Sequence, residues 1–182
     1  LDVARSGDDE SVIQPVRGRF AHANTPLRNQ TGPSLGAAAL DTAQRLRRGA
    51  ETITINVDII GVGASAYDWL TEHAPEHVNV RAVNVASKAT TERHAKLRDQ
   101  LAFGLREWLE DGGVIPPGAD EVRSDAVALT YSFDTRGKYK VTSKDELKSA
   151  LGRSPDHGDA LMLAIYQAPD PFIPAGVLGW DD

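Results

Sequence analysis

The chain has 182 residues, a length typical of one domain with a real hydrophobic core. Hydrophobic residues make up 41% of it and no apolar run approaches the roughly 20 residues that span a bilayer, so we expect no membrane partner. The absence of cysteine excludes disulfides, thiolate metal sites and cysteine nucleophiles. The net charge of -6 argues against a protein that holds nucleic acid by charge alone, but it is compatible with a carboxylate cluster that binds metal ions.

The first part of the chain alternates between extended and helical patterns. In chain order we expect strands at 1–5 and 11–16, a loop at 21–34, a helix at 35–48, a strand at 51–58, a helix after the glycine turn at 61–63 and a strand at 78–85. Ile53, Ile55 and Val57 alternate with polar residues, which is the period of a strand with one buried face. Because Leu1 already reads as the middle of a strand, we expect the chain to be a fragment of a longer protein.

The second part is expected to be mainly helical, with one β-hairpin. In chain order we expect the longest helix at 90–111, a turn at 116–120, a hairpin with strands at 126–133 and 138–142, a helix at 143–151 and a last helix at 154–166. Ser154 is the expected cap of that last helix and Pro155 its first residue. Residues 1–168 are expected to form one domain and 169–182 a loose tail. The mixed order of strands and helices predicts an α/β fold with a mixed sheet.

Acidic residues stand at four positions where folding does not require them. Asp2 lies within the first strand, Asp58 ends the clearest strand, and Asp156 and Asp159 share one face of the first turn of the last helix. Acids from these elements could converge where strand ends meet a helix start. Like charges repel, but two divalent cations such as Mg²⁺ or Mn²⁺, about 4 Å apart, reverse that cost. One ion would activate a water and the other would stabilise the leaving oxygen of a phosphodiester.

Each acid also has an ordinary structural interpretation. Asp2 could face solvent, and Asp58 could end its strand through an Asx-type turn. Asp156 and Asp159 could stabilise a helix N-terminus through the helix dipole. His157 could contact a metal or a phosphate, although we expect it to be a partly exposed helix residue.

Other enzyme classes find less support in the sequence. The glycines at 61–63 follow a strand, as in a dinucleotide-binding loop, but Ala66 replaces the third glycine of that motif. Ser65 lacks the glycines of a nucleophile elbow, so a hydrolase triad is not expected. No P-loop pattern is present, so we do not expect this chain to hydrolyse ATP.

Five segments of the chain, in order, resemble the nuclease domain of the large terminase subunits of tailed bacteriophages. They are Leu1-Asp2-Val3-Ala4-Arg5 with Gly7-Asp8-Asp9 and Val12-Ile13, residues 57–63 with Asp68, residues 93–117, Ser143-Lys144-Asp145-Glu146, and residues 154–161. The resemblance implies a ribonuclease H-like mixed β-sheet flanked by helices, and a two-metal endonuclease that cuts concatemeric viral DNA. It places the first metal aspartate at Asp2 and the second at Asp58. The third falls on Asp159, with Asp156 as the close second choice.

The resemblance also implies partners. The substrate would be double-stranded DNA in the host cytoplasm, where a phage or prophage protein of this kind acts. An ATPase domain in the full-length chain, a portal and a small terminase subunit would complete the motor. Basic residues would neutralise DNA phosphates with little sequence preference, foremost Lys144, together with Arg136, Lys138, Lys140 and Arg5. A Holliday-junction resolvase or a ribonuclease H of the same fold remains an alternative, as does a non-catalytic domain that docks on the motor.

Overall fold

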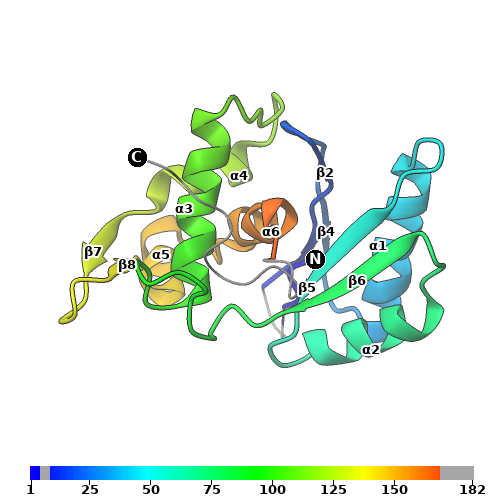
Figure 1. Cartoon of the computed structure of the whole chain (residues 1–182), viewed down its shortest axis with the longest axis horizontal. Helices are drawn as coiled ribbons and strands as arrows, with labels where there is room; N and C mark the ends of the chain where they lie inside the picture. The colour runs from blue at the N-terminus through cyan, green and yellow to red at the C-terminus, as the bar shows by residue number, and fades with distance from the viewer. Residues whose placement is uncertain (5–8, 169–182) are drawn as a thin grey trace.

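The structure is a computed structural model that describes residues 1–4 and 9–168. Arg5 and the expected tail at 169–182 therefore lie outside the described residues. In chain order the elements are β1 (Ser11–Ile13), β2 (Val16–Arg17), β3 (Phe20–Ala21), β4 (Thr25–Leu27), α1 (Gly32–Leu46), β5 (Ile53–Asp58), α2 (Gly63–His73), β6 (Val78–Val83), α3 (Leu97–Glu110), α4 (Asp120–Ala128), β7 (Tyr131–Phe133), β8 (Tyr139–Val141), α5 (Lys144–Leu151) and α6 (Asp156–Ile165) (Figure 1).

The first residues of the chain form the centre of a mixed sheet. Asp2 exchanges two backbone hydrogen bonds with Val12 of β1, at 3.0 and 2.9 Å, in an antiparallel arrangement. On the other side, the Leu1 nitrogen donates to the Asn56 carbonyl oxygen at 2.7 Å, and the Asp58 N–H donates to the Leu1 carbonyl oxygen at 3.1 Å. This pattern is that of a parallel neighbour. Because β1 pairs antiparallel with β4 and β5 pairs parallel with β6, the strand order is β4, β1, the N-terminal segment, β5, β6.

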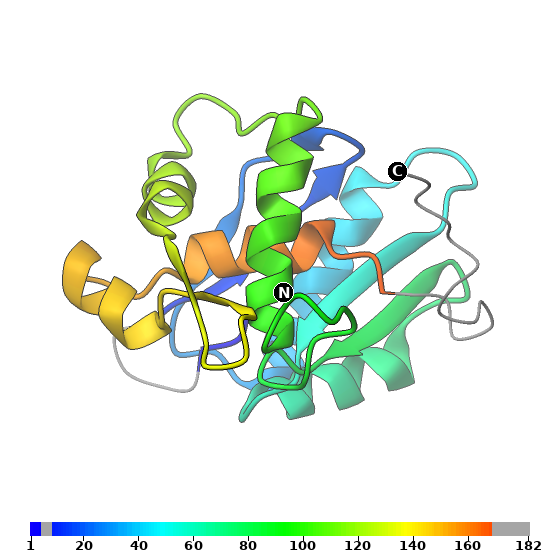
Figure 2. The same cartoon turned by 60° about the vertical axis from the view of Figure 1, so that its left-hand side comes forward.

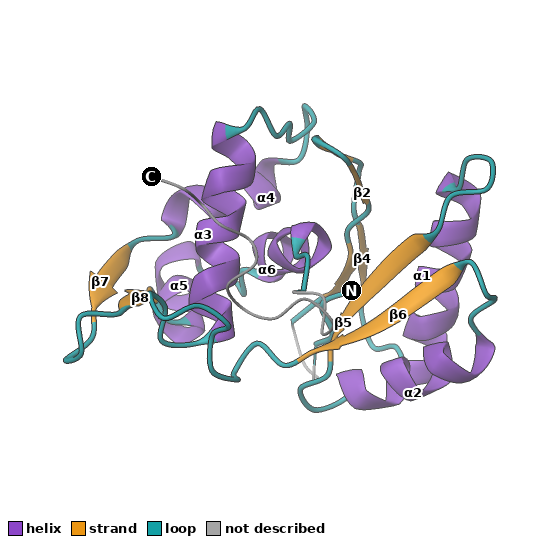
Figure 3. Cartoon of the chain, in the orientation of Figure 1, coloured by secondary structure: helices purple, strands orange, loops and turns teal. Residues whose placement is uncertain are grey.

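Helices cover both faces of this sheet. Helices α1 and α2 pack on one face, and α6 packs on the other against β1 and β5 (Figures 1 and 3). Helix α3 crosses over α6 as an outer layer (Figure 2). Leu35, Leu70 and Val57 are fully buried in the first core, and Leu161 and Leu163 in the second. Among the described residues, no helix is long and apolar enough to cross a bilayer. The mixed α/β fold predicted from the order of elements is confirmed.

The helix expected at 35–48, the strands at 51–58 and 78–85, the hairpin turn and the helix at 143–151 are confirmed. The loop expected at 21–34 is wrong. Strand β4 lies there and pairs with β1, with Thr25 opposite Ile13, and α1 already begins at Gly32 after the Thr31 cap. Pairing with a neighbouring strand thus overrides a polar, proline-containing composition.

The helix expected at 90–111 is wrong in its first turns and is not the longest. Helix α3 begins at Leu97 and has 14 residues, one fewer than α1. The preceding loop is held instead by β8, because Tyr139 N–H donates to the Arg93 carbonyl oxygen at 2.8 Å and Ala95 N–H donates to that of Tyr139 at 3.2 Å.

Two further boundaries need correction. The strand expected at 126–133 is helical in its first residues, since α4 runs to Ala128 and β7 begins only at Tyr131. Helix α6 begins at Asp156, so Pro155 is the cap position rather than the first helical residue. The Ser154 hydroxyl does not cap the helix, because it donates to the Asp156 carboxylate.

Candidate active site

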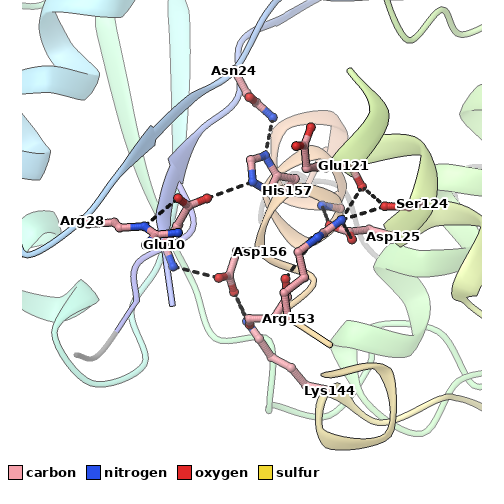
Figure 4. A network of polar contacts seen from close by, with 12 residues as sticks. Glu10, Asn24, Arg28, Glu121, Ser124, Asp125, Lys144, Arg153, Asp156 and His157 are labelled. Carbon is pink, nitrogen blue, oxygen red and sulfur yellow. Dashed lines mark hydrogen bonds and ion pairs between the residues drawn. The ribbon is translucent and has the colours of Figure 1, made fainter. Parts of the chain in front are cut away.

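The structure brings the four predicted acids together at one end of the sheet. The parallel register of the first residues with β5 sets Asp2 beside Asp58, and the first turn of α6 presents Asp156 and Asp159 to them. The ammonium group of Lys144, at the start of α5, lies among these carboxylates, and Figure 4 shows its ion pair with Asp156. Its Nζ is 3.0 Å from Asp156 Oδ1, 3.0 Å from Asp159 Oδ2 and 3.8 Å from Asp2 Oδ2.

Burial makes this cluster electrostatically costly. Asp2 is only 5% exposed, and burial raises the pKa of its carboxyl from 3.8 to about 7. Lys144 offsets part of that rise, while the charges of Asp159, Asp156 and Asp58 add to it. Burial also raises the pKa of Asp58. For Lys144, burial disfavours the ammonium ion, but the neighbouring carboxylates outweigh it and raise the pKa of that amine well above its usual range. The site therefore carries more negative charge than its lysine neutralises.

A tight backbone turn fixes the position of Asp58. Its Oδ1 accepts a hydrogen bond from the Ile60 N–H at 3.2 Å, so the Asx-type turn considered from the sequence is present. Helix α2 starts directly behind this turn at Gly63. A Cβ at Gly63 would lie 1.8 Å from the Asp58 carbonyl oxygen, so only glycine lets the helix approach the strand end this closely.

A buried ion pair between α4 and the segment before α6 fixes the position of the last two acids. Asp125 is 1% exposed and accepts a hydrogen bond from the Gly158 N–H at 2.8 Å, within the first turn of α6. Arg153 NH2 lies 2.7 Å from Asp125 Oδ1, and Arg153 also donates to the Ser124 hydroxyl (Figure 4). Nothing in the sequence pattern pointed to Asp125 or to its ion pair with Arg153, because the two residues are distant along the chain.

Arg98 is a further residue of the site that the sequence did not reveal. It lies in the first turn of α3, with its NH2 3.5 Å from Asp159 Oδ1. Its NH1 donates to the Thr142 carbonyl oxygen at 2.8 Å, two residues before Lys144. Arg98 therefore links Asp159 to the segment that carries the lysine.

His157 differs from expectation, because it is 8% exposed rather than partly exposed. Its Nδ1 lies 2.9 Å from the Asn24 amide nitrogen, which can only donate, so Nδ1 accepts. The proton is then on Nε2, which donates to Glu10 Oε2 at 3.1 Å (Figure 4). A hydrogen bond from Arg28 lowers the pKa of Glu10. The Glu10 N–H in turn donates to Asp156 Oδ2 at 2.9 Å, so this network supports one of the four acids.

The basic residues predicted to contact DNA occupy two different places. Arg136 and Lys140 are exposed on the β7–β8 hairpin, and Lys138 is partly exposed there. Lys144 instead lies among the acids, with 41% of its side chain exposed. The position of Arg5 lies outside the described residues.

The donor set suits a hard divalent cation, because all four acids offer carboxylate oxygens. Within the described part of the chain, however, no three carboxylate or imidazole groups already stand in an arrangement that would hold one ion. The Lys144 ammonium ion takes the position of a cation between them.

No protein-family model matches the chain, and no curated protein sequence does. Solved structures do match. The nuclease domain of the large terminase subunit gp2 of bacterial virus Sf6 aligns over 92% of this chain and 86% of its own, with a TM-score of 0.68 and 17% identity. A lysine-to-alanine mutant of that domain with manganese and beta-thujaplicinol aligns with a TM-score of 0.72 and 15% identity over the same shares. A lysine-to-alanine mutant with calcium aligns with a TM-score of 0.70 and 16% identity, again over 92% of this chain and 86% of its own.

These similarities cover nearly the whole described chain, while the identities are low. They confirm the fold expected from the sequence motifs, a mixed β-sheet flanked by helices. The chain has the ribonuclease H-like fold of the nuclease domain of a bacteriophage large terminase subunit.

Proposed function

We propose that this chain is a metal-dependent DNA endonuclease domain of a viral DNA-packaging terminase. The observation that carries the proposal is the gathering of Asp2, Asp58, Asp156 and Asp159 from three separate elements around one ammonium ion. Folding alone does not favour such a cluster, since burial and mutual repulsion raise the pKa of Asp2 to about 7. Acids retained at that cost are typical of a functional site.

Two divalent cations, Mg²⁺ or Mn²⁺, are proposed to bind at these acids. The manganese and calcium in the Sf6 structures support a divalent cation in this fold. When bound, such ions would supply an activated water and stabilise the leaving oxygen of a phosphodiester. The lysine that now neutralises the acids would be displaced, and Lys144 could then pair with a DNA phosphate, as expected from the sequence.

The hydrogen bonds favour different roles for the two acids of α6. Both oxygens of Asp156 already accept protein donors, Oδ1 from the Ser154 hydroxyl and Oδ2 from the Glu10 N–H. Among the described residues, the Asp159 carboxylate pairs with the cations of Lys144 and Arg98 and accepts no hydrogen bond from a backbone N–H or a hydroxyl. We therefore assign Asp159, with Asp2 and Asp58, as the metal ligands and Asp156 as their support.

The proposal extends to the substrate, the location, the partners and the domain bounds of this chain. A terminase nuclease domain would cut concatemeric double-stranded DNA with little sequence specificity, in the cytoplasm of the host. Its partners would be an ATPase domain, a portal and a small terminase subunit. Residues 1–168 would form the nuclease domain and 169–182 a tail that follows it.

Cleavage of supercoiled plasmid tests the activity. The purified chain is incubated with Mn²⁺, Mg²⁺ or EDTA, beside Asp58→Asn and the matched variant Asp120→Asn, whose carboxylate is 85% exposed on α4. Nicked and linear DNA should form with metal only, and Asp58→Asn should abolish both while Asp120→Asn cuts normally. Faster cleavage of an RNA–DNA hybrid or a four-way junction would favour a ribonuclease H or a resolvase. No cleavage and no Mn²⁺ binding by calorimetry would leave a docking role.

A further inference from the structure

The β7–β8 hairpin presents an exposed aromatic face. Tyr131 and Phe133 point to the same side of β7, and Tyr139 lies opposite Phe133 on β8. The rings of Phe133 and Tyr139 are 5.0 Å apart, and Tyr139 packs on Phe103 of α3 at 4.6 Å. Tyr131 and Phe133 nevertheless remain 53% and 60% exposed. A rigid aromatic surface that is only half covered is typical of a binding site.

An apolar cavity continues this face into the body of the protein. It has a volume of about 350 Å³ and lies between α3, α4 and β7, lined by Phe103, Leu109, Leu129 and Tyr131 among others. Its size falls in the range of pockets that hold small organic groups. The exposed rings and the cavity together form a surface on which a planar ring could stack or insert.

Basic residues are frequent in the hairpin that carries this aromatic face and in the loop beside it, although Lys140, opposite Ser132, lies on the other face of the hairpin. The loop at 84–96, whose backbone pairs with Tyr139, and the hairpin at 131–141 together carry Lys88, Arg93, Lys96, Arg136, Lys138 and Lys140. Glu92 and Asp134 are the acidic residues of these two segments, and the Asp134 carboxylate is engaged by the N–H groups of Arg136 and Lys138. These two segments therefore carry a net charge of +4 in a chain whose net charge is -6. Their charge is complementary to a polyanion rather than to an apolar peptide.

The hairpin leads directly into Lys144, which pairs with the acids. Val141 ends β8 three residues before Lys144, a distance of at most about 11 Å along an extended chain. Arg98 strengthens this connection, because it bonds the Thr142 carbonyl oxygen and lies beside Asp159. A DNA strand whose phosphate lies at the acids would reach the aromatic face within a few nucleotides.

We propose that the aromatic face of the hairpin binds unpaired nucleotides of a DNA strand by base stacking. The proposal rests on the nuclease function proposed above and adds a substrate feature to it. Within a duplex the faces of the bases are covered by their neighbours, so exposed rings such as Tyr131 and Phe133 can stack only on unpaired bases. Stacking is sequence-tolerant, and the lysines and arginines of the hairpin and of the loop at 84–96 attract the phosphates of the strand.

Fluorescence anisotropy in EDTA tests this without cleavage. The labelled probes are an oligo-dT single strand, a blunt duplex and the same duplex with a single-stranded extension. The variant Tyr131→Ala/Phe133→Ala is compared with Val127→Ala, which removes an apolar side chain that is 84% exposed on α4, away from the hairpin. Because stacking contributes about 1–3 kcal/mol per base, the double variant should bind the single strand and the extension about tenfold or more weakly. Its affinity for the blunt duplex should change less than about twofold.

The swap Tyr131→Phe/Phe133→Tyr keeps both rings and should restore single-strand binding, which separates stacking from folding effects. An equal loss on all three probes, or no loss on any, would overturn the proposal. The second outcome would indicate a protein partner for this face. Plasmid cleavage by the parent is scored separately. A parent that cuts plasmid but does not bind single strands refutes the stacking proposal alone, and a parent that binds single strands but never cuts refutes the nuclease alone.

Discussion

Replacing Lys144 with alanine should weaken the folded state and strengthen metal binding at the same time. The ammonium group contacts three carboxylates, two of them at 3.0 Å. Removing one partner of a buried ion pair costs about 3–5 kcal/mol, whereas exposed pairs contribute at most about 1 kcal/mol. With 41% of its side chain exposed, Lys144 lies between these limits. We expect a loss of about 2 kcal/mol without metal, or roughly 4–8 °C in Tm for a domain of this size.

The same contacts oppose metal binding, because a cation must displace the ammonium group. Lys144→Ala should therefore bind Mn²⁺ more tightly by about the same 2 kcal/mol, close to 30-fold. Calorimetric titration with Mn²⁺ measures the affinity, and thermal unfolding in EDTA and in Mn²⁺ measures the stability. In saturating Mn²⁺ the variant should recover most of its lost Tm, since a ligand that binds only the folded state stabilises it.

Lys148→Ala is the matched control for this prediction. Lys148 lies one turn further along α5, has 49% of its side chain exposed and pairs with Asp9 at 2.6 Å, outside the group of four acids. It should change neither the Mn²⁺ affinity nor the response of Tm to metal. Weaker Mn²⁺ binding in Lys144→Ala, or binding equal to that of Lys148→Ala, would refute the competition between lysine and metal.

Three further predictions concern one of the acids, Asp2, and two residues that position the others. Burial raises the pKa of Asp2 from 3.8 to about 7. Between these two pH values the folded state holds a proton that the unfolded chain has released. The free energy of unfolding in EDTA should therefore fall as the pH rises from 3.8 to about 7. Asp2→Asn should remove up to about 4 kcal/mol of this fall, and parallel pH profiles of denaturant unfolding for both proteins would test it. Gly63→Ala would set a Cβ 1.8 Å from the Asp58 carbonyl oxygen and should lower both Tm and Mn²⁺ affinity. Gly104→Ala is the control, because a Cβ there meets no atom within 4 Å, and it should stabilise α3 by about 0.5–1 kcal/mol. Asp125→Ala leaves Arg153 without its buried partner and should cost about 3 kcal/mol in urea unfolding; an unchanged midpoint would contradict this.

The convergence of the acids could be predicted because it depends on local signals. Asp58 ends an alternating strand before a glycine turn, and Asp156 and Asp159 begin a helix, so strand ends and a helix start were expected to meet. What was missed depends on contacts between distant segments. Residues 126–133 alternate like a strand, yet the first three of them complete α4, which packs on α6. The loop before α3 has a helical composition, but its backbone bonds to Tyr139 of β8 instead.

The position of Lys144 shows the same limit. Its place in the chain indicated a basic residue near the last acids, and we expected it to face DNA. In the structure it neutralises the acids themselves, because Lys144 is the first residue of α5 and its ammonium group lies 3.0 Å from the carboxylates of both Asp156 and Asp159. Arg98 could not be found from the sequence, since its link to Asp159 spans 61 positions of the chain.

Crystallography of the protein with Mn²⁺, using anomalous diffraction at the manganese edge, tests the central claim most directly. The claim is that Asp2, Asp58 and Asp159 hold divalent cations once Lys144 withdraws. Two anomalous peaks coordinated by these carboxylates, with the lysine ammonium moved away from Asp156 and Asp159, are the predicted result. Crystals that bind Mn²⁺ elsewhere, or not at all, with the lysine still paired to the acids, would contradict the account.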